Sequence, residues 1–329
     1  MNQIMKFQSQ LLNWYDLHGR KNLPWQVDDS YLVWISEIML QQTQVLKVID
    51  YFNAFISEFP NMKLLAQADI NDVLALWSGL GYYNRARNIH KTAQICVQEH
   101  NAILPLDLKK LMALPGIGQT TAGAILSLAS NLPFAILDGN VKRVMSRVYR
   151  VGEIKLSEYT NKLWQLAEQN ISKQRPKNYN QALMDLGSLV CVRSKPRCHE
   201  CPLNTLCQAY QVNETELYPP KKTKTKQIAV TLHALLVIKD EKILLRKRGE
   251  TGIWAGLWFL PEFIGKKNSN LLHSIKHVLS HRILTINVYK NKELVDKIQD
   301  CHWVALSDLK KFAHPSALVK IINAVDLKY

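Results

Sequence analysis

The stretch that decides the fold of this chain runs Leu111-Met-Ala-Leu-Pro-Gly-Ile-Gly-Gln-Thr-Thr-Ala-Gly-Ala-Ile-Leu126. Pro115 and the two glycines after it forbid one continuous helix, so the pattern predicts a helix, a tight turn and a second helix that begins near Gln119. Gly116 and Gly118 leave backbone N–H groups free at the start of that second helix, which is a ready site for a phosphate. The sequence therefore predicts a helical hairpin that offers an anion site.

Apolar residues at helical spacing extend outward from this hairpin through the first 210 residues. Asp28, Asp29 and Ser30 supply N-cap chemistry for a long helix that starts near Tyr31. Helices are expected at 4–18, 31–59, 63–77, 84–100, 106–113, 119–130, 139–150, 158–171 and 178–190. Because no alternating strand pattern interrupts them, this part of the chain is predicted to be all-α.

The character of the sequence changes at Tyr218-Pro-Pro-Lys-Lys-Thr-Lys-Thr-Lys226, which has the composition of a linker. We expect a helical domain at 1–217, a linker at 218–227 and a separate α+β domain at 228–329. Strands are expected in the last domain at 228–238, 242–246, 258–263, 282–289 and 300–304, with helices at 269–279 and 307–312.

The composition narrows the class of protein. A net charge of +15 over 329 residues favours a polyanionic partner, although charge alone does not separate nucleic acid from acidic lipid. No apolar run reaches the length of a membrane span, and the first residues lack the apolar stretch of a secretory signal. We therefore expect a cytoplasmic protein whose six cysteines stay reduced.

Four cysteines follow one another with the spacing C-x6-C-x2-C-x5-C. They are Cys191, Cys198, Cys201 and Cys207. Four thiolates this close in sequence can converge on one metal centre, and the spacing by itself leaves a structural zinc and a [4Fe–4S] cluster both open. Arg193, Lys195 and Arg197 lie between the first two cysteines and would project either toward a DNA phosphate or into solvent.

A further string runs Trp34-Ile-Ser-Glu37-Ile-Met-Leu-Gln41-Gln42-Thr43-Gln44-Val45. On a helix, Glu37, Gln41 and Gln44 would share one face. By itself Glu37 is more often a solvated surface acid. However, this string resembles a motif of the MutY-type adenine DNA glycosylases, in the helix-hairpin-helix iron–sulfur superfamily. The hairpin, Leu80-Gly-Tyr-Tyr83, Asp138-Gly-Asn140 and the four cysteines match as well, so the resemblance covers essentially the whole chain.

The resemblance implies a monofunctional enzyme of base excision repair that hydrolyses the N-glycosidic bond of adenine mispaired with 8-oxoguanine or guanine. Glu37 would protonate the departing base, and Asp138 would stabilise the sugar cation or a transient covalent adduct. Asn140 would orient Asp138 or its water, although Asp138 and Asn140 are equally ordinary helix-capping residues. The four cysteines would bind a [4Fe–4S] cluster, and the partner would be duplex DNA, bound by a monomer.

Thr120 distinguishes two related families. The endonuclease III family has a lysine at this hairpin position, which attacks the sugar and permits strand cleavage. A hydroxyl replaces that amine here, so a glycosylase without lyase activity is expected. Lys142, which follows Asp138 by four residues, would contact a phosphate or react adventitiously with the abasic aldehyde, and it is not assigned as a catalytic residue.

By the same resemblance, a larger set of residues would contact DNA or the bases. They are Gln42, Thr43, Leu80, Tyr82, Gly116, Gly118, Thr120, Lys142, Gln181, Ser280 and His281. Core packing is the plain alternative for Leu80 and Tyr82. Ser280 and His281 match two positions of a Phe-Ser-His loop that contacts 8-oxoguanine in the family, whereas Leu279 replaces its aromatic residue.

The C-terminal domain resembles the Nudix-like domain of the same enzymes, most clearly at 252–261. Because the expected helix at 271–278 lacks the acidic residues of a Nudix hydrolase, this domain should bind rather than hydrolyse. Three rival interpretations remain: an endonuclease III-type glycosylase and lyase, a non-catalytic iron–sulfur DNA-binding protein, and a nucleotide hydrolase that uses the C-terminal domain.

Overall fold

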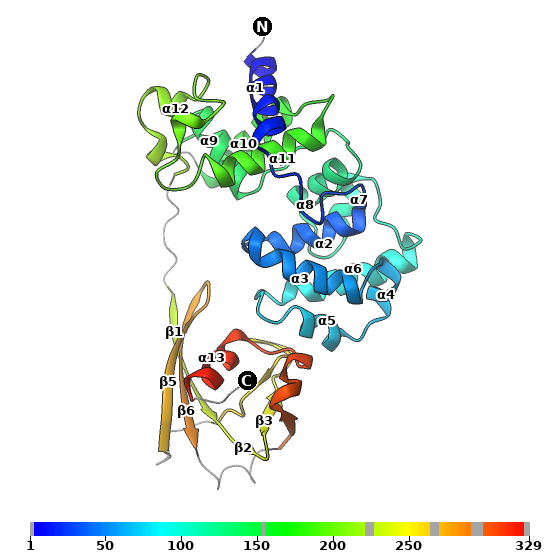
Figure 1. The fold of residues 1–329 in the computed structure, drawn as a ribbon, viewed down its shortest axis with the longest axis vertical. Coiled ribbons are helices and arrows are strands. Elements are labelled where there is room, and N and C mark those ends of the chain that lie inside the picture. Colours follow the sequence, from blue (N-terminus) through cyan, green and yellow to red (C-terminus); the bar gives the residue numbers. More distant parts are fainter. Residues whose placement is uncertain (1–2, 153–154, 221–226, 264–269, 291–298, 326–329) are drawn as a thin grey trace. The chain divides into compact units, whose positions relative to one another are not determined.

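A computed structural model of the chain describes residues 3–152, 155–220, 227–263, 270–290 and 299–325 (Figure 1). Its contacts divide the chain into two compact units. The helical unit contains Met1–Ala66 and Lys91–Lys222, and the mixed unit contains Gln67–His90 and Thr223–Tyr329. Among the described residues, no helix has both the length and the apolar character needed to span a membrane.

Every regular element in the described residues before 221 is helical, as the sequence predicts. In chain order these are α1 (Gln3–His18), α2 (Ser30–Leu40), α3 (Val45–Glu58), α4 (Met62–Gln67), α5 (Ile70–Leu76), α6 (Asn84–Glu99), α7 (Leu108–Ala113), α8 (Gln119–Ala124), the π-helix η1 (Ile125–Ala129), α9 (Gly139–Val148), α10 (Leu156–Asn170), α11 (Pro176–Leu189), the short 3₁₀ helix η2 (Cys198–Glu200), α12 (Gln208–Gln211) and the short 3₁₀ helix η3 (Thr215–Leu217).

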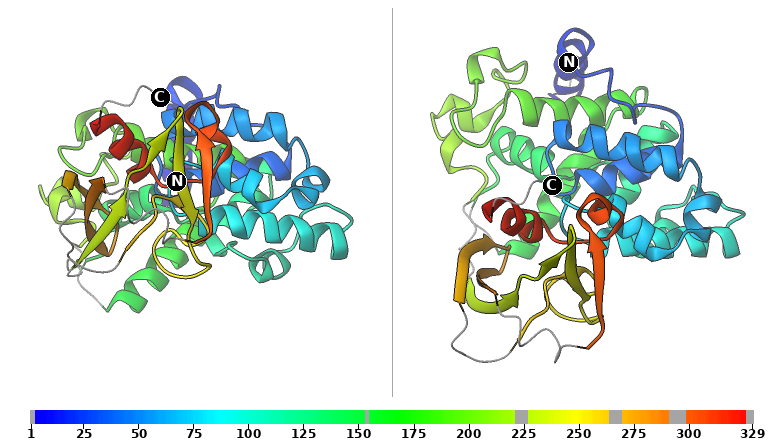
Figure 2. Two further views of the ribbon diagram at one scale, coloured as in Figure 1. Left: turned by 90° about the horizontal axis from the view of Figure 1, so that it is seen from below. Right: turned by 60° about the horizontal axis from the view of Figure 1, so that its bottom comes forward.

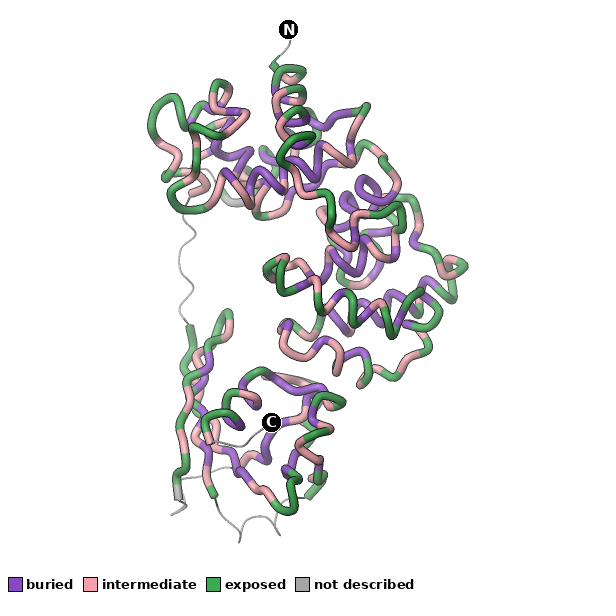
Figure 3. Tube along the Cα trace, in the orientation of Figure 1, coloured by how far each residue is buried: buried purple, intermediate pink, exposed green. Residues whose placement is uncertain are grey.

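Helix α11 lies at the centre of the helical unit, where it packs against α1, α9 and η1. Phe7 of α1, Val144 of α9 and Leu186 of α11 belong to one buried core, and Figure 3 marks the buried residues along these helices in purple. Each such apolar side chain contributes about 1.5–3 kcal/mol of burial free energy. This packing holds α9, whose N-terminal end carries Asp138, against α11.

The expected hairpin is present as α7, a turn and α8. Gly116 has φ +77°, a left-handed conformation that favours glycine, and the N–H of Ile117 donates to the carbonyl of Leu114 at 3.2 Å. Thr92 Oγ1 donates to the carbonyl of Pro115 at 3.0 Å and fixes the turn from a neighbouring helix. The hairpin that the sequence predicts is confirmed.

The single helix expected at 31–59 is wrong. Helix α2 ends at Leu40 and α3 begins at Val45, because Gln42 takes a left-handed conformation with φ 59°. This break lets α3 fold back and pack on α2. Gln41 and Gln44 become the cap residues at the break, so they do not continue the helical face of Glu37.

The mixed unit contains two sheets. One has the order β1 (Ile228–Leu235), β6 (Arg282–Lys290), β5 (Asn270–Val278), with β1 parallel and β5 antiparallel to β6. The other has the order β2 (Ile238–Lys239), β3 (Lys242–Lys247), β4 (Trp258–Phe259), and β7 (Cys301–Ala305) also pairs with β3. The 3₁₀ helix η5 (Leu306–Lys311) and α13 (Ser316–Ala324) follow, and α13 packs on β5 (Figure 2).

The helix expected at 269–279 is also wrong, because Asn270–Val278 forms strand β5, whereas residue 269 lies outside the described residues. His273, Ile275 and His277 are more buried than the intervening Ser274 and Lys276, which is the alternation of a strand. The apolar residues near its start imitate helical spacing, but the ladder with β6 decides the structure. The segment that the sequence analysis compared with the acidic helix of a Nudix hydrolase is therefore a strand.

The segment 67–90 packs on the C-terminal part of the mixed unit, with α5 against η5. Tyr83 donates from its hydroxyl to the carbonyl of His314 at 2.6 Å, and Arg87 Nη2 donates to the carbonyl of Ala255 at 2.6 Å. These contacts fix the segment around the Leu80–Tyr83 turn against the backbone at His314 and Ala255.

Candidate active site

Glu37 lies near the C-terminal end of α2, a helix whose start is fixed by Asp29. The Asp29 carboxylate accepts from the N–H groups of Tyr31 at 2.8 Å and Leu32 at 3.2 Å. The Glu37 side chain is partly buried, and burial raises its pKa to about 8, helped by the negative charge on Asp138. Glu37 is therefore a neutral acid at pH 7, which is the state that a proton donor needs.

Asp138 is the N-cap of α9. Its Oδ1 accepts from the N–H of Val141 at 2.7 Å, and its Oδ2 accepts from Nδ2 of Asn140 at 3.0 Å. Burial raises the pKa of Asp138, whereas these hydrogen bonds lower it. Capping and a catalytic role are thus compatible, because the donors that cap the helix also favour the ionised carboxylate. Two interacting carboxyl groups in unequal surroundings are suited to separate acid and anion roles.

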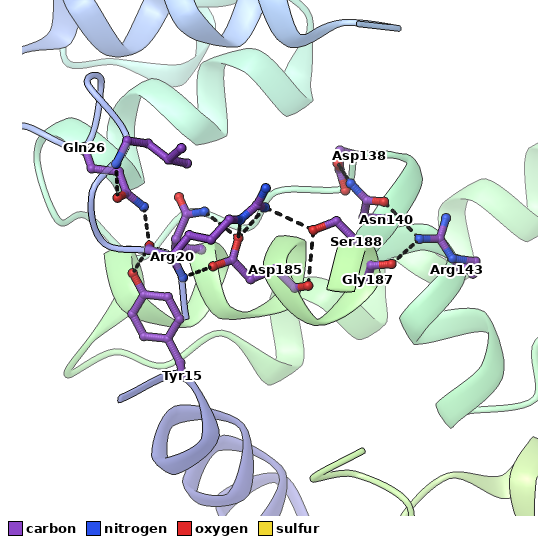
Figure 4. A network of polar contacts seen from close by, with 11 residues as sticks. Tyr15, Arg20, Gln26, Asp138, Asn140, Arg143, Asp185, Gly187 and Ser188 are labelled. Carbon is purple, nitrogen blue, oxygen red and sulfur yellow. Dashed lines mark hydrogen bonds and ion pairs between the residues drawn. The ribbon is translucent and has the colours of Figure 1, made fainter. Parts of the chain in front are cut away.

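Arg143 holds the loop that carries Asp138 and Asn140 (Figure 4). The sequence analysis did not identify Arg143. Its Nη2 donates to Oδ1 of Asn140 at 2.9 Å and also to the carbonyl of Gly187. Its Nε donates to the carbonyl of Cys191 at 2.7 Å. One side chain therefore ties the Asp138–Asn140 loop to the end of α11 and to the first cysteine. The signal in the sequence is weak, since an arginine within a helix of a basic protein is common.

Thr120 lies at the start of α8, where its Oγ1 donates to the carbonyl of Leu137 at 3.2 Å. The hairpin hydroxyl is thus next to the loop that carries Asp138. Lys142 is one turn into α9 and its backbone N–H donates to the carbonyl of Asp138 at 2.9 Å. In the break after α2, Gln42 is exposed, and Thr43 Oγ1 donates to the carbonyl of Gln41 at 3.4 Å.

A cavity of about 150 Å³ lies beside Gln181 in the helical unit. Trp25, Val33 and Leu128 give it apolar walls, and Lys21 and Asn178 contribute polar groups. Val33 precedes Glu37 by one turn of α2, so this cavity and the acid occupy the same face of that helix. An engineered apolar cavity of this volume accommodates benzene, so the space suits an aromatic ring.

Two more residues that the sequence analysis missed lie next to Gln181. Asp185 has no exposed surface and pairs with Arg20, whose Nη2 is 2.5 Å from Oδ1 of the aspartate. Gln181 Nε2 donates to the same Oδ1 at 3.0 Å. The available signal in the sequence was an aspartate among the apolar residues of a predicted helix, because an aspartate buried there is usually paired with a cation.

The four cysteines of the predicted metal centre line one cavity in the helical unit. These are Cys191, Cys198, Cys201 and Cys207, and all are free thiols. Burial raises the pKa of Cys201 to about 12 and that of Cys207 to about 11, with the charges of the neighbouring sulfurs adding to the rise. Among the described residues, no group of three or more His, Cys, Asp or Glu side chains is arranged to hold a single metal ion.

Arg147 holds the cysteine segment from α9, four residues after Arg143. It is 1% exposed, and its Nη1 donates to Sγ of Cys191 at 3.3 Å and to the carbonyl of Val192 at 2.7 Å. Its Nη2 donates to the carbonyl of Arg193 at 3.0 Å. A buried cation beside four thiols fits a centre that carries negative charge from its thiolate ligands, so these residues fit an iron–sulfur cluster.

The three basic residues of this segment differ in their surroundings. Arg193 and Lys195 are exposed, and the N–H of Lys195 donates to Oε1 of Glu216 at 3.0 Å. Arg197 forms an ion pair with Glu200 at 3.0 Å and donates to the carbonyl of Leu189. Arg193 and Lys195 are therefore better placed than Arg197 to meet an external anion.

The mixed unit contains its own groove of about 760 Å³, which brings together four of the predicted contact residues. Leu80, Tyr82, Ser280 and His281 all line it. The hydroxyl groups of Tyr82 and Ser280 are 2.7 Å apart. Leu80 is 6% exposed and Tyr82 is 47% exposed, so core packing accounts for the first but not for the second.

These two sites sit in a fold that is also found in known proteins. Residues 35–169 match the HhH-GPD superfamily base excision DNA repair protein, and residues 233–324 match the NUDIX domain. A thermostable thymine-DNA glycosylase has a similar structure, with a TM-score of 0.58 and 25% identity, covering 64% of this chain and 97% of that one. A non-covalent endonuclease III–DNA complex contains a chain of the same fold, with a TM-score of 0.56 and 21% identity. The fold is that of a helix-hairpin-helix DNA glycosylase.

More similar sequences define the class further. The adenine DNA glycosylase of Buchnera aphidicola subsp. Baizongia pistaciae is 41% identical over 97% of this chain and 96% of its own length. The adenine DNA glycosylase of Rattus norvegicus is 41% identical over 99% of this chain and 70% of its own length. The chain belongs to the adenine DNA glycosylase family, a family of hydrolases that act on N-glycosyl bonds, and the resemblance seen in the sequence is confirmed.

Proposed function

We propose that this chain is a monofunctional glycosylase that removes adenine mispaired with 8-oxoguanine or guanine in duplex DNA. The observation that supports it most is the pair Glu37 and Asp138, two interacting carboxyl groups of which burial raises the pKa of Glu37 to about 8, whereas Asp138 also accepts hydrogen bonds that favour its ionised form. One neutral acid and one carboxylate are the two groups that hydrolysis of a glycosidic bond requires.

Adenine is a poor leaving group as an anion, so it must gain a proton as the bond to the sugar breaks. Glu37 holds that proton at neutral pH, because its pKa is raised to about 8. The target nucleotide must leave the base stack to reach it. The cavity at Gln181, on the same face of α2 as Glu37, is the space in which we place the extruded base.

The sugar develops the charge of an oxocarbenium ion when the base departs. Asp138, held by the N–H of Val141 and by Asn140, supplies the negative charge that stabilises this cation or a transient covalent adduct. Asn140 is itself held by Arg143, so the carboxylate is preorganised. We therefore assign catalysis to Glu37 and Asp138, with Asn140 orienting Asp138 or the attacking water.

Thr120 supports the absence of lyase activity, because its hydroxyl replaces an amine at the hairpin and donates to the carbonyl of Leu137. The free N–H groups at Gly116 and Gly118, together with Lys142, would bind the DNA backbone, which is the usual role of a hairpin turn and of lysine. Gln42 and Thr43, in the break after α2, would contact the bases from an exposed turn.

The four cysteines would hold a [4Fe–4S] cluster that fixes the basic segment containing Arg193 and Lys195. We propose 1–217 as the catalytic domain, 218–227 as a linker and 228–329 as the Nudix-like domain that reads the lesion. Tyr82 and Ser280, with Leu80 and His281 in the same groove, would contact the base opposite adenine. The enzyme would act as a monomer on chromosomal DNA in the cytoplasm.

The test uses purified protein and duplexes that contain A·8-oxoguanine, A·G, A·T or thymine glycol, with half of each sample treated with alkali. We expect cleavage of the adenine strand only after alkali, and most strongly opposite 8-oxoguanine. Strand breaks at thymine glycol without alkali would instead establish an endonuclease III-type lyase. Binding of the duplexes without base release would establish a non-catalytic DNA-binding protein.

A further inference from the structure

Asp185 lies wholly buried in α11, and both oxygens of its carboxylate accept hydrogen bonds. Its Oδ2 accepts from the backbone N–H of Arg20 at 2.7 Å. Its Oδ1 accepts from Arg20 Nε at 2.9 Å, from Arg20 Nη2 at 2.5 Å and from Gln181 Nε2 at 3.0 Å (Figure 4). The side-chain cation of Arg20 faces this carboxylate and compensates its buried charge, and a carboxylate can only accept hydrogen bonds.

This acceptor fixes which way the amide of Gln181 faces. An amide has one branch that donates and one that accepts, and the two are usually interchangeable unless a neighbour discriminates between them. Beside Asp185 only the NH₂ branch can be accommodated, because a carbonyl oxygen would face a carboxylate. The branch that remains for the cavity is Oε1, a hydrogen-bond acceptor.

The same aspartate also anchors another part of the wall of that cavity. The loop after α1 is tied to itself by Gln26, whose Nε2 donates to the carbonyl of Arg20 at 2.8 Å and whose Oε1 accepts from the N–H of Leu23 at 3.1 Å. Trp25 and Gln26 in this loop line the cavity together with Gln181. Asp185 therefore holds both the polar group and the aromatic wall that a planar base would meet.

We propose that Asp185 and Arg20 form a positioning pair that makes Gln181 an obligatory acceptor and thereby selects a purine with a 6-amino group over a 6-oxo purine. This inference rests on the proposed placement of the extruded base in the cavity. The 6-amino group of adenine donates a hydrogen bond, whereas the 6-oxo group of hypoxanthine accepts one. A site built around one acceptor rejects the analogue that offers a second acceptor, because neither group is then paired.

The test compares Asp185→Asn with the wild-type enzyme in single-turnover reactions, on duplexes that carry 2′-deoxyadenosine or 2′-deoxyinosine opposite 8-oxoguanine. An asparagine at 185 can donate as well as accept, so the Gln181 amide becomes free to turn over. We expect the adenine-to-hypoxanthine ratio of the single-turnover rate constants to fall about tenfold, the effect of one discriminating hydrogen bond. Asp16→Asn, which removes an exposed ion pair with Arg175, is the matched control and should leave the ratio unchanged.

A double variant guards against a simple loss of packing. In Gln181→Glu with Asp185→Asn, the new asparagine donates and the new glutamate accepts, which restores an acceptor toward the cavity. We expect this variant to regain most of the ratio that Asp185→Asn loses. Equal losses on both substrates in Asp185→Asn, no loss at all, or no recovery in the double variant would overturn the positioning role. A wild-type enzyme that releases no adenine from the duplex with 2′-deoxyadenosine opposite 8-oxoguanine would instead contradict the proposed function itself.

Discussion

Arg143 Nη2 donates to Oδ1 of Asn140 at 2.9 Å, while Nδ2 of the same asparagine donates to Oδ2 of Asp138 at 3.0 Å. The amide of Asn140 is thus held in one orientation, with its oxygen toward a cation and its NH₂ toward the carboxylate. Arg143 also donates to the carbonyl of Cys191 at 2.7 Å, so a single side chain connects the backbone of the first cysteine to the loop that carries Asp138.

Removal of this link should slow catalysis more than binding. In Arg143→Ala, Asn140 loses the partner of its oxygen, and we expect the single-turnover rate to fall about ten- to a hundredfold, as for loss of a charge-assisted hydrogen bond. Arg150→Ala, which breaks an exposed pair with Glu214, is the control. Rates and duplex affinity measured together decide the matter, since unchanged rates would remove Arg143 from the orientation of Asp138.

Glu37→Gln should abolish adenine release yet retain binding of the mispaired duplex, because the amide occupies the same space but supplies no acid. Binding is measured by a gel shift and base release by alkaline cleavage. Substantial turnover by Glu37→Gln would show that another group protonates the base.

The same substitution should stabilise the protein, with a dependence on pH. The pKa of Glu37 is raised to about 8 in the folded state, above its ordinary value of about 4.5, so the folded protein binds more protons between these values. Stability is therefore lost as the pH rises through this window, and Glu37→Gln avoids that loss. We expect the Tm of the variant to exceed that of the wild type by about 2–4 °C at pH 8 and to match it near pH 4, by calorimetry.

The pH profile of the reaction should have two limbs. Above about pH 8 Glu37 loses its proton and the rate falls, since the acid form is the active one. At low pH Asp138 becomes neutral and the rate falls again, at a pH above the ordinary range of an aspartate, because burial raises its pKa. Single-turnover rates from pH 4 to 10 test this, and a rate that keeps increasing toward high pH would contradict the assignment of Glu37.

Gly187 should tolerate no side chain. A Cβ at this position in α11 would lie 2.6 Å from the Cβ of Asn140, so α9 and α11 would be forced apart at the Asp138–Asn140 loop. We expect Gly187→Ala to lower the free energy of unfolding by about 1–3 kcal/mol, in the range of overpacking, and to reduce activity. Gly249→Ala, where a Cβ meets nothing within 4 Å, is the control in the same denaturation experiment.

The hydrogen bond between Tyr82 and Ser280 should set the preference for the opposite base. Tyr82→Phe keeps the ring but removes the hydroxyl that lies 2.7 Å from Ser280, and we expect the preference for A·8-oxoguanine over A·G to fall about three- to tenfold. Trp303→Phe changes another exposed aromatic residue of the mixed unit and serves as the control. An unchanged preference in Tyr82→Phe would exclude this contact from lesion reading.

The two errors in the expected elements have the same origin. The segments 31–59 and 269–279 each carry apolar residues at helical spacing, which predicts a helix but contains no information about breaks or about pairing with other strands. A left-handed Gln42 breaks the first, and the ladder between β5 and β6 makes the second a strand. The strand depends on a partner that is distant in the sequence, which no local pattern contains.

By itself the sequence determined the hairpin, the all-α first part, the change of character near Tyr218 and the residue types of the site, because turns, helix periods and four close cysteines are local features. Only the tertiary structure decided that the charge of Asp138 raises the pKa of Glu37 and that Arg143 links Asn140 to Cys191 by hydrogen bonds. It also decided that Arg20 forms an ion pair with Asp185. Burial and long-range contacts set protonation states and side-chain orientations, and these arise only when the separate helices pack together.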